Sequence, residues 1–128
     1  MPKLSATKIL AVDNNDSMQD LLGKVFKKTQ MLVCPPGKLG NSSFFDAWHD
    51  SRPFDIAIID MKMPGEISGE QLIYQIRKVE PHFPIILISS DIEGGKRLAQ
   101  KLGVEFSPKP FEVFQLAMQV ERMVKRSC

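Results

Sequence analysis

The sequence predicts an α/β fold with a sheet of five parallel strands and helices on both of its faces. Three observations predict it. Short apolar runs rich in β-branched residues alternate with segments whose apolar residues recur at helical spacing. One run, residues 56–59, is apolar without interruption, which is typical of a strand buried on both faces. Several runs end in polar side chains, and the carboxyl ends of strands in open parallel sheets form binding crevices. This alternation implies right-handed crossovers and a three-layer arrangement.

The first half of the chain is expected to contain three strands and two helices. The predicted strands span residues 8–12, 31–34 and 56–60. A first helix is expected after the cap candidates Asn15 and Asp16, because the apolar residues that follow them have helical spacing. A short second helix is expected to begin at Ser42 or Ser43 and to end before Pro53.

A third helix is expected to begin at Ser68 or Gly69. Its apolar stripe consists of Leu72, Ile73, Ile76 and Val79. Pro81 closes this helix, and Pro84 begins the fourth strand, which runs to residue 88. The chain therefore returns to the sheet after a short connection.

The last part of the chain is expected to add two helices and one strand. The fourth helix spans residues 93–102 and stops at Gly103, and the fifth strand spans residues 104–108. The last helix has the clearest period. Its apolar face consists of Val113, Leu116, Ala117, Val120, Met123 and Val124. Phe114 and Met118 lie off this face and are expected to be partly exposed.

Pro108 helps to predict the order of the strands. A proline in a strand is tolerated at the edge of a sheet, because it has no N–H group to donate to a second neighbour. The last strand is an edge strand in the flavodoxin-like order 2-1-3-4-5, which we therefore expect. At 128 residues the chain is long enough for one core, so residues 1–128 are expected to form a single domain.

Composition excludes several classes of function. The hydrophobic content of 43% and the charged content of 25% are those of an ordinary globular protein. A net charge of +2 is too small to indicate binding to nucleic acid or to a membrane by electrostatics. Cys34 and Cys128 form no disulfide framework, and no apolar run approaches the length that crosses a bilayer. We therefore expect a cytoplasmic protein.

Polar residues at the strand ends predict a site at one edge of the sheet. Asp13 and Asp60 can supply the oxygen ligands that Mg²⁺ prefers. A carboxylate beside Mg²⁺ can attack phosphorus and form an aspartyl phosphate, with Lys109 as the neutralising ammonium and Ser89 as a hydroxyl donor to the phosphoryl group. Each residue also has a simpler explanation, because Asp60 and Ser89 suit turn caps and a strand-end lysine is usually solvated.

These residues resemble the receiver domains of two-component response regulators, of the chemotaxis-regulator type. The motifs are Val12-Asp13, Ile59-Asp60-Met61-Lys62-Met63-Pro64, Leu87-Ile88-Ser89 and Lys109-Pro110-Phe111, in order over nearly the whole chain. The resemblance implies that Asp60 accepts a phosphoryl group from a histidine kinase or phosphotransfer protein. It implies that Asp13, Asp60 and the backbone carbonyl of Lys62 bind Mg²⁺. It also implies a cis Lys109–Pro110 peptide and a switch role for Phe106, for which a plain core role is the alternative.

The chain departs from the family pattern at several positions. Asn14 replaces the second acid of the first motif, so it offers a carbonyl oxygen without a charge and Mg²⁺ affinity is expected to fall. Asp16 either compensates or caps the first helix, and the cap is favoured. Gly69 follows Asp60 one residue later than usual. We also hypothesise an ion pair between Lys62 and Asp91 at the entrance to the site.

The expected function is a phosphorylation-dependent signalling switch without enzymatic output of its own. The alternative is an atypical receiver that binds protein partners without phosphate. A phosphatase of the haloacid-dehalogenase type is disfavoured, because Lys62 stands where that mechanism needs a second acid. A flavin-binding module is disfavoured because no glycine-rich phosphate loop follows the first strand. The expected partners are a histidine kinase or phosphotransfer protein and an output domain or downstream protein, with a homodimer as a further alternative.

Overall fold

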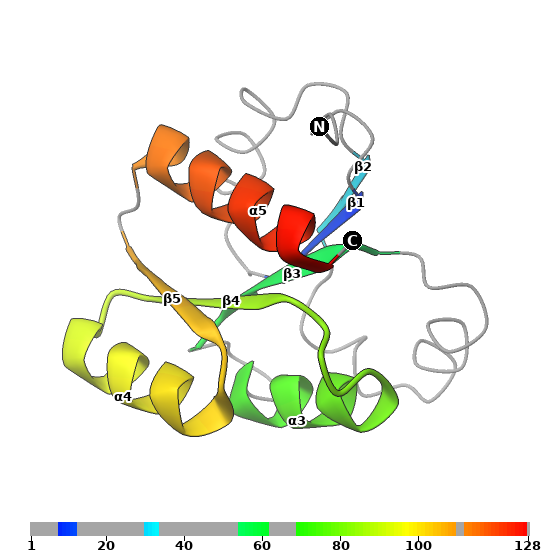
Figure 1. Cartoon of the computed structure of the whole chain (residues 1–128). Helices are drawn as coiled ribbons and strands as arrows, with labels where there is room; N and C mark the ends of the chain where they lie inside the picture. Colours follow the sequence, from blue (N-terminus) through cyan, green and yellow to red (C-terminus); the bar gives the residue numbers. More distant parts are fainter. Residues whose placement is uncertain (1–7, 13–29, 34–53, 62–68, 110–111, 128) are drawn as a thin grey trace.

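The computed structural model describes residues 8–12, 30–33, 54–61, 69–109 and 112–127 (Figure 1). In these ranges the chain forms the strands β1 (Lys8–Val12), β2 (Gln30–Val33), β3 (Ile56–Asp60), β4 (Ile85–Ser89) and β5 (Glu105–Pro108), and the helices α3 (Gly69–Val79), α4 (Ile92–Leu102) and α5 (Val113–Ser127). The two helices expected between the first three strands lie outside the described residues.

The strands form one parallel sheet in the order β2-β1-β3-β4-β5, which confirms the predicted topology. Strands β3 and β4 are buried along their whole length, as their unbroken apolar sequences predict. Strand β5 is at the edge of the sheet, and Pro108 at its end is exposed. The edge position of this proline agrees with its missing N–H group.

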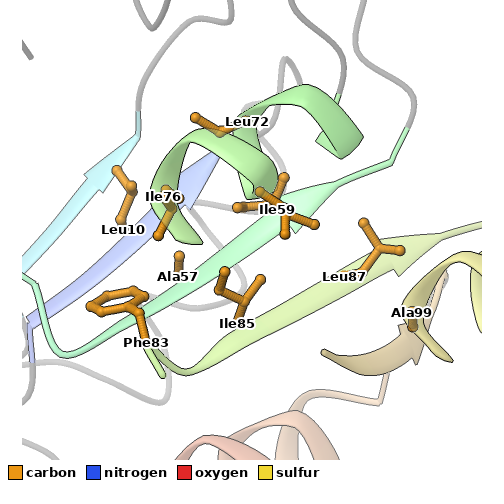
Figure 2. Close-up of a cluster of buried hydrophobic side chains, with 10 residues drawn as sticks. Leu10, Ala57, Ile59, Leu72, Ile76, Phe83, Ile85, Leu87 and Ala99 are labelled. Carbon is orange, nitrogen blue, oxygen red and sulfur yellow. The ribbon is translucent and has the colours of Figure 1, made fainter. Parts of the chain in front are cut away.

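Helices α3 and α4 cover one face of the sheet and α5 covers the other (Figure 1). Alternate residues of β3 serve the two faces, because successive side chains of a strand point in opposite directions. Ala57 and Ile59 join the cluster under α3 and α4, whereas Ile56 and Ile58 join the cluster under α5. Figure 2 shows the first cluster, which consists of Leu10, Ala57, Ile59, Leu72, Ile73, Ile76, Phe83, Ile85, Leu87 and Ala99.

The second cluster is built by α5 on the opposite face. Its helix residues are Leu116, Ala117, Val120, Met123 and Val124, as the apolar period predicts. The side chain of Val113 lies outside the described residues. Phe114 and Met118 are 70% and 69% exposed, so the prediction that they lie off the buried face is confirmed.

Local hydrogen bonds correct the predicted bounds of α4 and β5 by one residue each. The carboxylate of Asp91 caps α4, so the helix begins at Ile92 rather than at residue 93. Gly103 ends the helix in the left-handed conformation, with φ of 70°. The N–H group of Val104 donates to the carbonyl of Ala99, 3.0 Å away, so this residue still belongs to the end of the helix. Strands β2 and β4 are also displaced by one residue, from predicted bounds of 31–34 and 84–88.

Helix α3 begins and ends as the sequence predicts, and the start of α5 is capped by a side chain. Helix α3 begins at Gly69, the second of the two predicted starts, and it ends before Pro81. The side chain of Glu112 accepts hydrogen bonds from the N–H groups of Phe114 and Gln115, so it caps the start of α5. Within the described ranges, no helix combines the length and the apolar character needed to cross a membrane.

Candidate functional site

Three polar side chains lie at the carboxyl ends of neighbouring strands. Asp60 is the last residue of β3, Ser89 is the last residue of β4, and Lys109 follows β5. Backbone pairing extends one residue beyond the strands, because Met61 N–H donates to the Ile88 carbonyl and Lys109 N–H donates to the Ser89 carbonyl, both at 2.9 Å. The parallel strands thus place the three residues at the same end of the sheet, where the strands have their carboxyl ends, as the sequence predicts.

The carboxylate of Asp60 forms an ion pair with the ammonium of Lys109. Lys109 Nζ lies 2.9 Å from Asp60 Oδ2, and the two side chains are 24% and 9% exposed. Removing charges from water is costly, so a partly buried pair of this kind is weak evidence for a stabilising role. The simpler explanation of a fully solvated lysine does not describe this side chain. The pair places a cation in direct contact with the carboxylate that is predicted from the sequence to be the nucleophile.

The first residue of α3 lies against the main chain of Asp60. A Cβ atom added at Gly69 would be 2.4 Å from the Asp60 carbonyl oxygen and 3.0 Å from Met61 Cα. Only glycine allows this close approach without a shift of backbone. Gly69 therefore sets the distance between α3 and the end of β3. In the sequence, this glycine is recognisable as a helix start and as a motif position after Asp60, but nothing there indicates its contact with the Asp60 main chain.

Ser89 is 2% exposed, and its hydroxyl oxygen has a defined partner. Ser89 Oγ accepts a hydrogen bond from the N–H group of Asp91 at 3.0 Å. This bond is the turn-capping role that was the simpler explanation for Ser89. It uses the oxygen as an acceptor, so the hydroxyl proton takes no part in it.

The side chain of Asp91 caps the start of α4. Its Oδ1 accepts a hydrogen bond from the N–H group of Gly94 at 3.1 Å. Lys62 lies outside the described residues, so the hypothesised ion pair between Lys62 and Asp91 stays a prediction.

Phe106 is half-buried and packs on the cluster under α3 and α4. A Cβ atom added at Gly95 of α4 would be 2.2 Å from Cε1 of this ring, so the ring lies directly on the helix backbone. This packing fits both the core role and the switch role of Phe106. Sequence reasoning missed Gly95, although a glycine inside a helix often marks a packing constraint.

The metal ligands implied by the sequence are only partly described. Asp60 is described, whereas Asp13, Asn14 and Lys62 lie outside the described residues. Pro110 is also outside them, so the cis Lys109–Pro110 peptide stays a prediction. Val12 of β1 pairs with Ile59 of β3, and Asp13 and Asp60 are the next residues in the sequence. Carboxylate oxygens at adjacent strand ends fit Mg²⁺, which prefers hard oxygen ligands. The described residues alone contain no group of three or more His, Cys, Asp or Glu side chains that could hold a metal ion.

Comparison with curated proteins finds relatives that are much longer than this chain. The DNA-binding transcriptional regulator NtrC of Azospirillum brasilense is 30% identical over 121 residues, which are 93% of this chain and 24% of that protein. The protein-glutamate methylesterase/protein-glutamine glutaminase of Treponema pallidum is 31% identical over 108 residues, which are 80% of this chain and 26% of that protein. The chain therefore spans about a quarter of the length of these relatives.

Solved structures with the same fold include two isolated receiver domains. The receiver domain of the Francisella response regulator 1452 is 24% identical, with a TM-score of 0.77 over 96% of this chain and 100% of that one. A response regulator receiver domain protein from Clostridium thermocellum is 23% identical, with a TM-score of 0.78 over 95% of this chain and 97% of that one. A family model described as response regulator receiver domain matches residues 9–121. Because that match covers most of the chain, the protein belongs to the response regulator receiver domain family of two-component signalling.

Proposed function

We propose that the chain is a phosphorylation-dependent switch that accepts a phosphoryl group on Asp60. The observation that carries the proposal is the Asp60 carboxylate, 6% exposed at the end of β3, with its Oδ2 2.9 Å from Lys109 Nζ. Receiver domains are typically regulatory domains rather than enzymes. The chemistry therefore modifies this chain, and the downstream effect comes from its changed surface.

The proposed donor is a phosphohistidine on a histidine kinase or phosphotransfer protein. An oxygen of Asp60 forms a bond to phosphorus while the nitrogen–phosphorus bond of the donor breaks, and the imidazole leaves with that electron pair. Lys109 neutralises negative charge on the carboxylate and on the transferred group. The hydroxyl of Ser89 donates a hydrogen bond to a phosphoryl oxygen.

Asp60, Asp13 and the backbone carbonyl of Lys62 would hold Mg²⁺, with Asn14 as a neutral oxygen donor. The ion would supply charge neutralisation at the phosphoryl oxygens. Because Asn14 brings no charge, we expect Mg²⁺ to bind less tightly than with a second acid at this position.

The names of the relatives describe whole proteins, of which this chain matches about a quarter. We propose that the chain itself neither binds nucleic acid nor enters a membrane, that it works in the cytoplasm, and that its output passes to a linked domain or a separate protein. The exposed pair Phe114 and Met118 offers apolar area to such a partner or to a second copy.

A second candidate function is a receiver that binds partners without phosphate. It is favoured by one observation, the neutral Asn14 in the acidic motif. The close pairing of Asp60 with Lys109 favours the phosphorylated switch. Desolvating a carboxylate is costly, and binding a protein partner does not require a carboxylate at this position.

The test is intact-mass spectrometry after incubation with acetyl phosphate or phosphoramidate, with and without Mg²⁺. We expect a single phosphoryl adduct that needs Mg²⁺ and disappears in Asp60→Asn. Asp55→Asn is the matched control, because this exposed carboxylate lies just before the same strand. If the folded protein forms no adduct at any Mg²⁺ concentration, this result would contradict the phosphorylated switch and favour the phosphate-independent binding module.

A further inference from the structure

We propose that the cavity at the amino ends of β3, β4 and β5 binds a small zwitterion with an apolar body, of which an apolar α-amino acid is the simplest example. The cavity lies at the end of the sheet opposite to Asp60. Strand β3 runs between the two ends, which places them roughly 15 Å apart at about 3.3 Å per residue. The proposed phosphorylation makes no use of this cavity, so the two proposals are independent.

The size and the position of the cavity suit a small ligand. Its volume is about 530 Å³, and small-molecule sites typically occupy about 300–1,000 Å³. It is lined by residues at the starts of the three strands and at the ends of α3 and α5. Five elements therefore meet around one hollow, which polar and apolar side chains share.

Apolar side chains form much of the lining. Phe83 and Ile85, which Figure 2 shows near the start of β4, belong to the cluster under α3 and α4, and Met123 belongs to the cluster under α5. Phe54 and Val104 also line the cavity and are only half-buried. Apolar ligand atoms that cover these two side chains would remove apolar surface from water, which favours binding.

Arg77 supplies positive charge to the lining. A guanidinium has five N–H donors, and two hydrogen bonds join Arg77 to the carbonyls of Pro81 and Gly103. Burial lowers the pKa of this guanidinium, because its charged form is partly desolvated. A ligand carboxylate beside the remaining terminal N–H groups would offset that cost with charge-assisted hydrogen bonds.

Glu80 and Asp55 supply negative charge to the same lining. Glu80 follows α3, and hydrogen bonds of its backbone N–H and carbonyl groups, at 2.8 and 3.2 Å, fix its position. Glu105 also lines the cavity, but Arg122 Nη2 lies 2.7 Å from its carboxylate and balances its charge. We therefore assign the ligand ammonium to Glu80, which is half-buried and whose carboxylate oxygens can accept several hydrogen bonds.

The presence of both charge signs determines the class of ligand. A simple amine would leave the Arg77 guanidinium beside apolar ligand atoms, and a simple carboxylate would leave Glu80 in the same position. Desolvating a charge without a partner is costly, so a ligand with one charge gains less than a zwitterion. A metal ion is disfavoured, because the described residues contain no group of three or more His, Cys, Asp or Glu side chains that could hold one.

The site is tested by titrating the isotope-labelled whole chain with L-phenylalanine and with L-leucine while its amide NMR signals are recorded. We expect saturable shifts that are largest at Phe83, Gly103 and Val104, with a dissociation constant of about 1 mM, which is ordinary for ligands of so few atoms. The absence of saturable shifts at these residues with both amino acids would overturn the site.

Two truncated ligands test the need for both charges. Phenethylamine lacks the carboxylate of phenylalanine and phenylpropionate lacks the ammonium, so each should bind roughly tenfold more weakly than L-phenylalanine. Equal affinity of either compound would overturn the zwitterion. These ligands also test the positive end without an Arg77 variant, in which structural hydrogen bonds would be lost as well.

The assignment of the ammonium is tested by Glu80→Gln, with Glu93→Gln as the matched control because Glu93 is an exposed acid of α4 away from the described lining. We expect L-phenylalanine to bind roughly tenfold more weakly to Glu80→Gln and with unchanged affinity to Glu93→Gln. Phenylpropionate should bind Glu80→Gln at least as tightly as the wild type. Equal affinity of Glu80→Gln and the wild type for L-phenylalanine would overturn the assignment, and the amide spectrum of each variant reports that it is folded.

Discussion

Two cations at opposite ends of the sheet, Lys109 and Arg77, illustrate two uses of a partly buried charge. Lys109 follows β5 at the carboxyl end and pairs with the Asp60 carboxylate at 2.9 Å. Arg77 of α3 donates to the backbone carbonyls of Pro81 and Gly103, the latter at 3.1 Å. Burial lowers the pKa of the Arg77 guanidinium below its ordinary value.

The two cations differ in the group that accepts their hydrogen bonds. The carbonyls that accept from Arg77 are fixed parts of two turns, so this side chain joins the end of α3 to the turn between α4 and β5. It lines a cavity of about 530 Å³ together with residues such as Phe54, His82 and Met123. The carboxylate beside Lys109 can instead react, and the ammonium then has a new anion to neutralise. A cation held by carbonyls stabilises structure, whereas a cation held by a carboxylate at a strand end is available for chemistry.

The largest expected effect is on phosphorylation of Lys109→Met. Loss of a preorganised cation from the reacting group should slow adduct formation by about a hundredfold. The measurement is the time course of the phosphoryl adduct from phosphoramidate by intact mass. Arg77→Met is the control and should form the adduct at the wild-type rate. Equal slowing in both variants would show that Lys109 has no specific role in the reaction.

The next largest effect is on the stability of Arg77→Met. Two hydrogen bonds from a charged donor are lost, so the free energy of unfolding should fall by about 2 kcal/mol. Urea denaturation measures this change. Lys78→Met, at the exposed neighbouring position, should stay within about 0.5 kcal/mol of wild type. A similar loss in both variants would indicate a general effect of charge on α3.

Asp60→Asn is expected to stabilise the fold while abolishing the adduct. A neutral amide avoids the cost of a desolvated carboxylate, and the Lys109 ammonium, whose side chain is 24% exposed, keeps contact with water without its counter-ion, so the free energy of unfolding should rise by about 1 kcal/mol. Thermal and urea denaturation without Mg²⁺ would show it. A loss of more than about 2 kcal/mol would instead mark the Asp60–Lys109 pair as a structural bond like those of Arg77.

The smallest effect is expected at the surface pair of Glu105 and Arg122. Its 2.7 Å separation is shorter than that of the site pair, but the two side chains are 30% and 48% exposed. Arg122→Gln should cost about 0.5 kcal/mol at low salt and less at high salt. Lys125→Gln, which loses a 4.0 Å contact to Glu121, should cost less still. A larger and salt-independent loss would show that distance matters more than burial.

The elements that could be predicted from the sequence are those determined by the spacing of apolar residues and by the positions of proline and glycine. The unbroken run before Asp60, the proline in β5 and the apolar period of α5 gave the strand order and the buried faces. Parallel strands place Asp60, Ser89 and Lys109 at one edge, so this grouping followed from the strand ends alone. The one-residue errors at α4 and β5 arose because capping bonds, such as Val104 N–H to the Ala99 carbonyl, leave little trace in a pattern of apolar residues.

Contacts between elements could not be predicted in this way. The close approach of Gly69 to Asp60 and of Gly95 to Phe106 depends on the distance between a helix and a strand. Neither hydrophobic period nor turn propensity determines that distance. The glycines themselves were visible in the sequence, but a glycine indicates that something approaches closely without indicating what.

The edge position of Pro108 also bears on self-association by strand pairing. An edge strand offers unpaired N–H and C=O groups that can recruit a strand from another molecule. In β5, Pro108 has no N–H group to offer, and the carbonyl of Phe106 is occupied by the side chain of Gln119. With only four residues in the strand, a foreign strand would find little to pair with, so this edge should resist sheet extension in concentrated solution.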